Sequence, residues 1–179
     1  MKKQMSVIVL LCIAASLFPS CRGYHIGDIK HPQIDSVAIA PVKNTTSRAR
    51  LSIDLQAGLR VAIQGDGTYT LKNSKVADCV VHARIIRGLT QGVGTSYRSQ
   101  NKEDSDTSNF GTTMYKYLID VEYTVLIPGR NRPLIQTTVV TGESRFTALA
   151  DIEQARALAA KRAANDAAKK IISNITEAW

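Results

Sequence analysis

The clearest alternation of apolar and polar positions lies between residues 112 and 127 and predicts a half-buried β-strand. Every second residue there is apolar or aromatic, and most positions between them are polar. Successive side chains of a strand point to opposite faces of its sheet, so the alternation indicates one buried face and one solvated face. The apolar face consists of Tyr115, Tyr117, Ile119, Val121, Tyr123, Val125 and Ile127.

Four other segments also have strand patterns. Residues 35–46 are apolar at both phases of the alternation until Pro41, which is typical of a central strand that ends there. In residues 77–89, Cys79 belongs to the apolar face, so we expect a core thiol. The predicted strands are residues 35–46, 68–71, 77–89, 112–127 and 134–146, with a hairpin turn at 128–133.

Two segments show the three-to-four residue spacing of amphipathic helices. The first runs from about residue 49 to 64 and ends at a Gly-Asp-Gly sequence that tolerates positive φ. The second begins after Asp151, which can cap it, and continues to the end of the chain. Its inner stripe is rich in alanine, so we expect it to approach the sheet closely.

The order of elements is strand, helix, several strands, helix. It predicts an α+β fold: a single, mostly antiparallel sheet of four to five strands with two helices packed on one face. Residues 92–111 are mostly polar with few apolar residues to anchor them, and we expect a long disordered loop there.

The first twenty residues have the three-part plan of an export signal. Two lysines open the chain, residues 5–18 are apolar and uncharged, and a Pro-Ser pair interrupts the run before Cys21. The apolar part is too short to span a bilayer. An N-terminal core helix is the alternative, but such a helix would lack a polar face. We therefore expect residues 1–20 to be a lipoprotein signal peptide.

Cys21 stands where a bacterial lipoprotein carries its acylated cysteine, because the small Ser20 precedes it. Ordinary cleavage that leaves a plain thiol is the alternative. Acylation is favoured because the other cysteines offer no disulfide partner: Cys12 leaves with the leader and Cys79 lies in the apolar strand. We expect a palmitate-type anchor at Cys21. No aspartate follows it, which favours the outer membrane.

The exported part of the chain is basic. Residues 21–33 carry glycine and proline without periodicity and are expected to be a tether, and residues 34–179 form one domain. Losing two lysines with the leader lowers the basic residues from 23 to 21 against 15 acidic ones, so the formal net charge falls from +8 to +6. This excess suits anionic lipid or lipopolysaccharide, because export argues against nucleic acid.

The sequence carries no recognisable catalytic or metal-binding motif. It has no Gly-x-Ser-x-Gly elbow, HExxH helix or phosphate-cradling loop, and its three histidines are scattered. Asp120 and Glu122 share a strand face, a spacing compatible with acid–base catalysis. Lys116 on the same face favours plain charge pairing instead. We therefore expect a protein that binds partners, without enzymatic activity, cofactor or metal.

Several segments, taken in order, resemble the LPS-assembly lipoprotein family, LptE. A Gly-Tyr pair follows Cys21, then VAIAPVKNTT at 37–46 and GDGTYTL at 65–71, where the first helix ends. ADCVVHARI at 77–85, a tyrosine-rich strand and an alanine-rich terminal helix complete the order. No piece is specific alone, but together they cover nearly the whole mature chain.

The resemblance implies a role in lipopolysaccharide transport. Proteins similar to LptE are held at the periplasmic face of the outer membrane and sit inside the β-barrel translocon LptD. There they assist assembly of the barrel and bind lipopolysaccharide on its way to the surface. The implied partners are an LptD-type barrel, lipopolysaccharide and, through the acylated Cys21, the membrane. A curli-secretion-like subunit or a peptidoglycan-synthase activator, which act by protein–protein binding, are the alternative envelope lipoproteins.

The basic residues of the predicted hairpin are the candidate lipopolysaccharide-binding residues. Arg130 and Arg132 sit together at its tip, and arginine and lysine bind phosphate groups well. Lys116 could extend such a patch. Arg84 and Arg87 could also do so, although an unbulged strand would place them on opposite faces. Turn arginines that are merely solvated are the alternative.

Overall fold

The computed structural model describes residue 31 and residues 34–97, 110–147 and 151–177, without the side chains of 95–97 and 110–113. The predicted leader, lipidation site and most of the tether lie outside the described residues, as does the middle of the predicted disordered loop. The described elements are β1 Ser36–Ile39, β2 Lys43–Asn44, α2 Arg50–Asp66, β3 Thr70–Leu71, β4 Cys79–Tyr97, β5 Phe110–Leu126, β6 Ile135–Thr147 and α3 Ile152–Glu177.

The sheet is mixed, which corrects the prediction of a mostly antiparallel sheet of four to five strands. Among the described residues, six strands take part, in the order β3-β1-β4-β5-β6, and β2 also pairs with β4. β1 runs parallel to both β3 and β4, and β2 runs parallel to β4, whereas β4, β5 and β6 are antiparallel. Because α2 crosses over between β2 and β3, the chain returns in its original direction.

Two predicted segments differ from the structure in extent. The predicted strand 35–46 is two strands, because pairing with β4 stops after Ile39 and resumes at Lys43. Strand pairing of β4 with β5 continues to Tyr97 and Phe110, so the ends of the predicted loop 92–111 are strand. Glycine and threonine are frequent at these ends, so the sequence shows no apolar alternation there from which a strand could be predicted.

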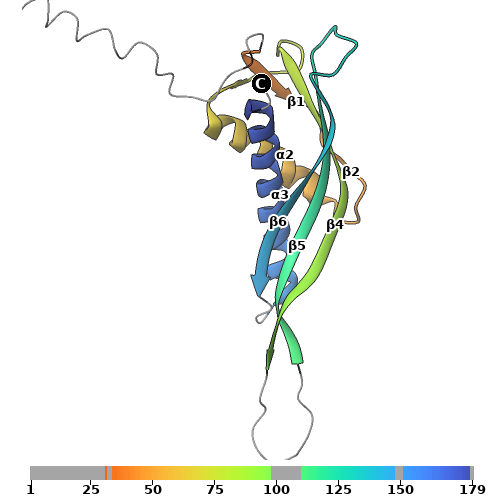
Figure 1. Cartoon of the computed structure of the whole chain (residues 1–179), viewed down its shortest axis with the longest axis vertical. Coiled ribbons are helices and arrows are strands. Elements are labelled where there is room, and N and C mark those ends of the chain that lie inside the picture. Colours follow the sequence, from red (N-terminus) through yellow and green to blue (C-terminus); the bar gives the residue numbers. More distant parts are fainter. Residues whose placement is uncertain (1–30, 32–33, 98–109, 148–150, 178–179) are drawn as a thin grey trace, which may run out of the picture.

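The two helices cover one face of a long, narrow sheet, as predicted, and β4 and β5 project beyond the helices as a two-stranded ribbon (Figure 1). α3 runs back along β6, so its C-terminal end lies at the same end of the sheet as the β5–β6 turn (Figure 1). Asp166 and Lys170 of α3 form an ion pair at 2.8 Å and also contact the β6 backbone. Asp166 accepts a hydrogen bond from the Glu143 amide, and Lys170 donates one to the Thr141 carbonyl.

The core lies between the helices and the covered face of the sheet, where the predicted apolar stripes meet. Cys79 is fully buried, and burial raises the pKa of its thiol to about 12, which confirms a core cysteine.

The Asp151 side chain accepts hydrogen bonds from the Glu153 and Gln154 amides, as predicted for a helix cap. The buried core residues of the helices are Leu51, Leu55, Leu59, Ile63, Ala159, Ala160, Ala163, Ala164, Ala167, Ala168, Ile171, Ile172 and Ile175.

The start of β4 is tied to β1 by a side-chain clamp. One carboxylate oxygen of Asp78 accepts hydrogen bonds from the Ser36 hydroxyl at 2.7 Å, the Ser36 amide at 2.8 Å and the Asp35 amide at 3.0 Å. The Asp78 amide donates in return to the Ser36 hydroxyl. Hydrogen bonding by the Ser36 side chain is the main reason that the pKa of Asp78 lies below its ordinary 3.8.

This lowered pKa predicts a pH-dependent contribution to stability. A carboxylate with a depressed pKa stabilises the folded state above its unfolded pKa, and the contribution disappears as the pH falls through the folded pKa. Asp78→Asn should therefore unfold at a lower temperature than the wild type at pH 7, and the difference should shrink as the pH falls below 3.8. Melting curves of both proteins between pH 7 and pH 3 test this, and a constant difference would contradict it.

Candidate functional site

The hairpin between β5 and β6 carries the two arginines that the sequence singled out. Gly129 has a φ of 80°, which a tight turn requires here, and the Arg130 amide donates to the Ile127 carbonyl at 3.1 Å. The Leu134 amide donates to the Val125 carbonyl at 2.8 Å and closes the hairpin. Arg130 and Arg132 are both exposed at this tip, so the structure brings them together as predicted.

The structure does not bring Lys116 to the tip. Lys116 lies ten residues before the end of β5 at Leu126, which corresponds to about 33 Å along a strand. Its ammonium group is 2.7 Å from a carboxylate oxygen of Glu143 on β6. The hydrogen bond from Lys116 is the main reason that the pKa of the Glu143 carboxyl lies below its ordinary range. Lys116 therefore belongs to a cross-strand ion pair in the middle of the sheet.

A bulge in β4 places Arg84 and Arg87 on the same face, unlike the arrangement expected for a regular strand. The register with β5 shifts between Ile85 and Arg87, so that Arg84 pairs with Glu122 and Arg87 with Asp120. The extra residue of a bulge reverses the alternation beyond it. The bulge lies at Ile85 and Ile86, where two consecutive isoleucines interrupt the alternation of the strand.

Asp120 and Glu122, whose spacing was compatible with acid–base catalysis, each form an ion pair with an arginine. One carboxylate oxygen of Asp120 lies 2.6 Å from Arg87 Nε, and the other accepts a hydrogen bond from the Thr141 hydroxyl at 2.8 Å. Both oxygens of Glu122 contact Arg84 Nη2, at 2.9 and 3.0 Å. This arrangement is the cross-strand charge pairing that Lys116 on the same face had suggested.

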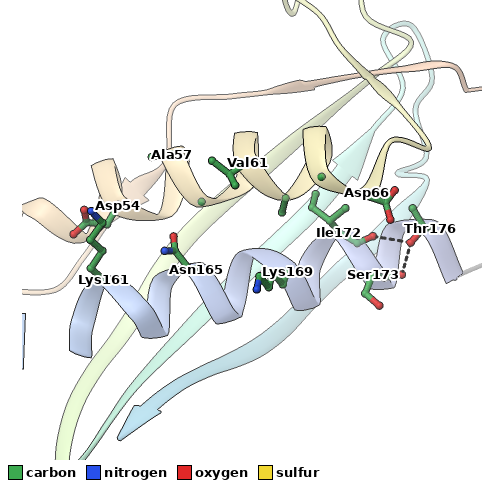
Figure 2. Close-up of a pocket in the computed structure, with 13 residues that line it drawn as sticks. Asp54, Ala57, Val61, Asp66, Lys161, Asn165, Lys169, Ile172, Ser173 and Thr176 are labelled. Carbon is green, nitrogen blue, oxygen red and sulfur yellow. Dashed lines mark hydrogen bonds between the residues drawn. The ribbon is translucent and has the colours of Figure 1, made fainter. Parts of the chain in front are cut away.

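The helical layer has a groove of about 720 Å³ along its outer side, between α2 and α3 (Figure 2). The two helices run in the same direction, and their N-terminal ends are joined by an ion pair between Arg48 and Glu153 at 3.5 Å. A Cβ on Gly58 would lie 2.7 Å from the side-chain oxygen of Asn165, so glycine permits this close approach. The groove is lined by Asp54, Ala57, Gly58, Val61, Ala62, Gly65, Asp66, Lys161, Asn165, Lys169, Ile172, Ser173 and Thr176.

Opposite charges stand on the two sides of this groove. Asp54 and Asp66 belong to α2, and Lys161 and Lys169 belong to α3 (Figure 2). Val61 on the α2 side is 67% exposed. An apolar floor between an acidic and a basic side can accept an apolar segment that carries charges of both signs. Sequence reasoning missed this groove, because it depends on how the two helices pack together.

Neither a membrane-spanning helix nor a metal-binding cluster is found in the described part of the chain. The helices in residues 34–177 that the structure describes are not long and apolar enough to cross a bilayer. Among the same residues, no three histidine, cysteine, aspartate or glutamate side chains are grouped so that they could hold a metal ion.

Fold and surface together define a small α+β domain with an exposed basic hairpin and a two-helix groove. The model of the family LptE, described as lipopolysaccharide-assembly, matches residues 34–175. The chain therefore belongs to the LptE family, and its function at family level is lipopolysaccharide assembly. The resemblance identified from the sequence is confirmed.

Solved structures with a similar fold come from several bacteria. A PelC dodecamer variant from Paraburkholderia phytofirmans is 11% identical, with a TM-score of 0.50 over 84% of this chain and 95% of that chain. The hypothetical protein CT253 from Chlamydia trachomatis is 11% identical, with a TM-score of 0.50 over 80% and 96%. Protein XCC0632 from Xanthomonas campestris is 10% identical, with a TM-score of 0.50 over 83% and 93%. These similarities concern the fold alone, and no curated protein matches the chain in sequence.

Proposed function

We propose that this protein is an outer-membrane lipoprotein that binds lipopolysaccharide and acts with an LptD-type β-barrel to deliver it to the cell surface. The observation that carries the proposal is the family match over residues 34–175. It is supported by the exposed Arg130 and Arg132 at the hairpin tip, because guanidinium groups bind phosphate through paired hydrogen bonds. The protein binds and positions its ligand and performs no chemical step.

The proposed layout is a signal peptide at residues 1–20, a tether at 21–33 and the LptE-like domain at 34–179. Acyl chains on Cys21 hold the domain at the periplasmic face of the outer membrane. Each buried methylene of an acyl chain contributes about 0.8 kcal/mol to membrane binding, so more than one chain makes a firm anchor. The tether lets the domain reach a barrel in the same membrane.

The anchor predicts that the protein incorporates fatty acid through one residue. Growth with labelled palmitate should give a labelled wild-type protein, whereas Cys21→Ala should take up no label and should leave the membrane fraction. Cys79→Ala is the matched control, because Cys79 is buried in the core and should not affect labelling. Equal labelling of the wild type and Cys21→Ala would exclude this anchor.

Purification of the acylated protein from membranes tests the partner. We expect a large outer-membrane barrel and lipopolysaccharide to co-purify with it after mild detergent extraction. The alternatives are a curli-secretion-like subunit or a peptidoglycan-synthase activator. Recovery of a homo-oligomeric ring or of a synthase, without a barrel, would favour them and contradict the proposal.

A further inference from the structure

A small notch opens on the face of the sheet opposite the helices, where β1 ends and β2 begins beside β4. Its volume is about 170 Å³. Liquid water occupies about 30 Å³ per molecule, so the notch has room for roughly five waters or one group of phosphate size with water, but not for a folded acyl chain. It is lined by Pro41, Lys43, His82, Ala83, Arg84, Glu122 and Thr124.

The notch exists because strand pairing with β4 is interrupted at Pro41. The Ala40 amide still donates to the Val81 carbonyl at 3.0 Å, and the Thr45 amide donates to the Ile85 carbonyl at 3.0 Å. Pro41 lies between these two bonds, where the segment joining β1 to β2 has one residue more than the facing part of β4, since Ile39 pairs with Val81 and Lys43 with Arg84. β1 and β2 are therefore separate strands, and the gap between them leaves the neighbouring stretch of β4 open at its edge.

Three basic side chains converge on this gap. Lys43 of β2 is the register partner of Arg84 on β4, and His82 lies two residues earlier on the same face of β4. All three are exposed. None of the ion pairs found among the described residues involves Lys43 or His82.

Arg84 is already held in position and keeps donors for a ligand. Its Nη2 contacts both carboxylate oxygens of Glu122, at 2.9 and 3.0 Å, and this leaves Nε and Nη1 for another acceptor. Glu122 balances one positive charge of the cluster, and Lys43 remains as the excess cation. Both groups bind phosphate, the guanidinium through paired hydrogen bonds and the ammonium as a point charge.

We propose that this notch binds a phosphate group of an anionic lipid, with Lys43, His82 and Arg84 as the contacting residues. The proposal rests on the proposed function, in which the lipid is lipopolysaccharide. Glu122, the partner of Arg84, lies four residues before Leu126 at the end of β5, or about 13 Å along the strand from the base of the hairpin. The notch therefore lies towards the hairpin end of the sheet, which is also the end that carries Arg130 and Arg132.

The test compares full-length acylated variants in detergent with two probes, lipid A carrying its phosphates and inorganic phosphate. Lys43→Gln combined with His82→Gln removes two contacts and leaves the pair between Arg84 and Glu122 intact. Lipid A affinity should fall by about fivefold or more, the scale expected when charge-assisted hydrogen bonds are lost. Arg60→Gln, an equal charge change at an exposed position of α2 outside the groove, should leave affinity within about twofold.

Inorganic phosphate tests the notch directly. Titration into the wild type should shift the backbone amide signals of His82 and Arg84, and the double variant should show no such shifts while keeping the wild-type melting temperature. Shifts together with unchanged lipid A affinity would mean that the notch takes free phosphate, and would overturn the lipid assignment. No shifts and unchanged affinity would overturn the proposal altogether.

Failure of the proposed function can be distinguished from failure of the notch assignment. If the wild type does not bind lipid A at all, lipopolysaccharide binding is refuted, and the phosphate titration alone then decides whether the notch is an anion site. If the wild type binds lipid A and both double variant and control bind it equally well, the proposed function stands and the notch assignment falls.

Discussion

Gly142→Ala is expected to destabilise the protein by about 3 kcal/mol or more, because a core position without free space is forced to accept a methyl group. A Cβ at this position would clash with the carbonyl oxygen of Ala163 and would lie 2.7 Å from the Cβ and 2.8 Å from the amide nitrogen of Ala167. Two of these three atoms belong to the α3 backbone, so no rotamer change can relieve the overlap.

The cost is large because α3 is fixed on both sides of the contact. Asp166 and Lys170 bind the β6 backbone next to Gly142, and the neighbouring alanines are fully buried. Moving the helix outward would break these bonds and expose its alanine stripe. Small residues on both surfaces are what allow the helix to lie this close to the strand.

Gly65→Ala is the matched control for this prediction. Gly65 lies in α2, and a Cβ there would meet no atom within 4 Å. Since alanine favours a helix over glycine by roughly 0.5–1 kcal/mol, this variant should be slightly more stable than the wild type. Chemical unfolding of both variants measures the two effects, and a Gly142→Ala protein as stable as Gly65→Ala would refute the close packing of α3 on β6.

Reversing the charge of the hairpin tip should have the largest effect on ligand binding. Arg130→Glu combined with Arg132→Glu replaces two phosphate-binding groups by two that repel phosphate, and lipopolysaccharide affinity should fall by about tenfold or more. Both side chains are exposed in a turn, so the melting temperature should stay close to that of the wild type. Equilibrium binding of purified lipopolysaccharide to the full-length protein provides the measurement.

Arg50→Glu with Arg60→Glu separates a local effect from the loss of overall charge. Both residues are exposed on α2, and the formal charge change equals that of the tip variant. Because screening weakens interactions between distant surface charges, this control should bind nearly as well as the wild type. If tip and control variants lose affinity equally, the basic excess of the whole protein binds the ligand, and the tip is not a site.

The regular elements could be predicted from the sequence because their apolar patterns are long. The tyrosine-rich strand, the capped terminal helix and the alanine stripe all agree with the structure, and the stripe even predicted a close approach to the sheet. The mixed direction of the sheet could not be predicted, since β2 and β3 have two residues each and carry no readable alternation. Their direction depends on pairing with distant strands.

The candidate surfaces were only partly predictable for a related reason. Arg130 and Arg132 are close in sequence, so a turn was enough to bring them together. Lys43 and Arg84 are neighbours only through strand register, and Arg84 and Arg87 share a face only because β4 has a bulge. Lys116 was grouped with Arg130 and Arg132 only because of its charge. In the structure, most of the length of β5 separates it from the hairpin tip.

Depletion of this protein from growing cells tests most directly whether it delivers lipopolysaccharide. Surface-exposed lipopolysaccharide can be labelled on intact cells and compared with the total extracted from the same cells. We expect the surface fraction to fall while lipopolysaccharide accumulates inside the envelope, and we expect the wild-type protein to restore it. An unchanged surface fraction after complete depletion would contradict a role in lipopolysaccharide delivery.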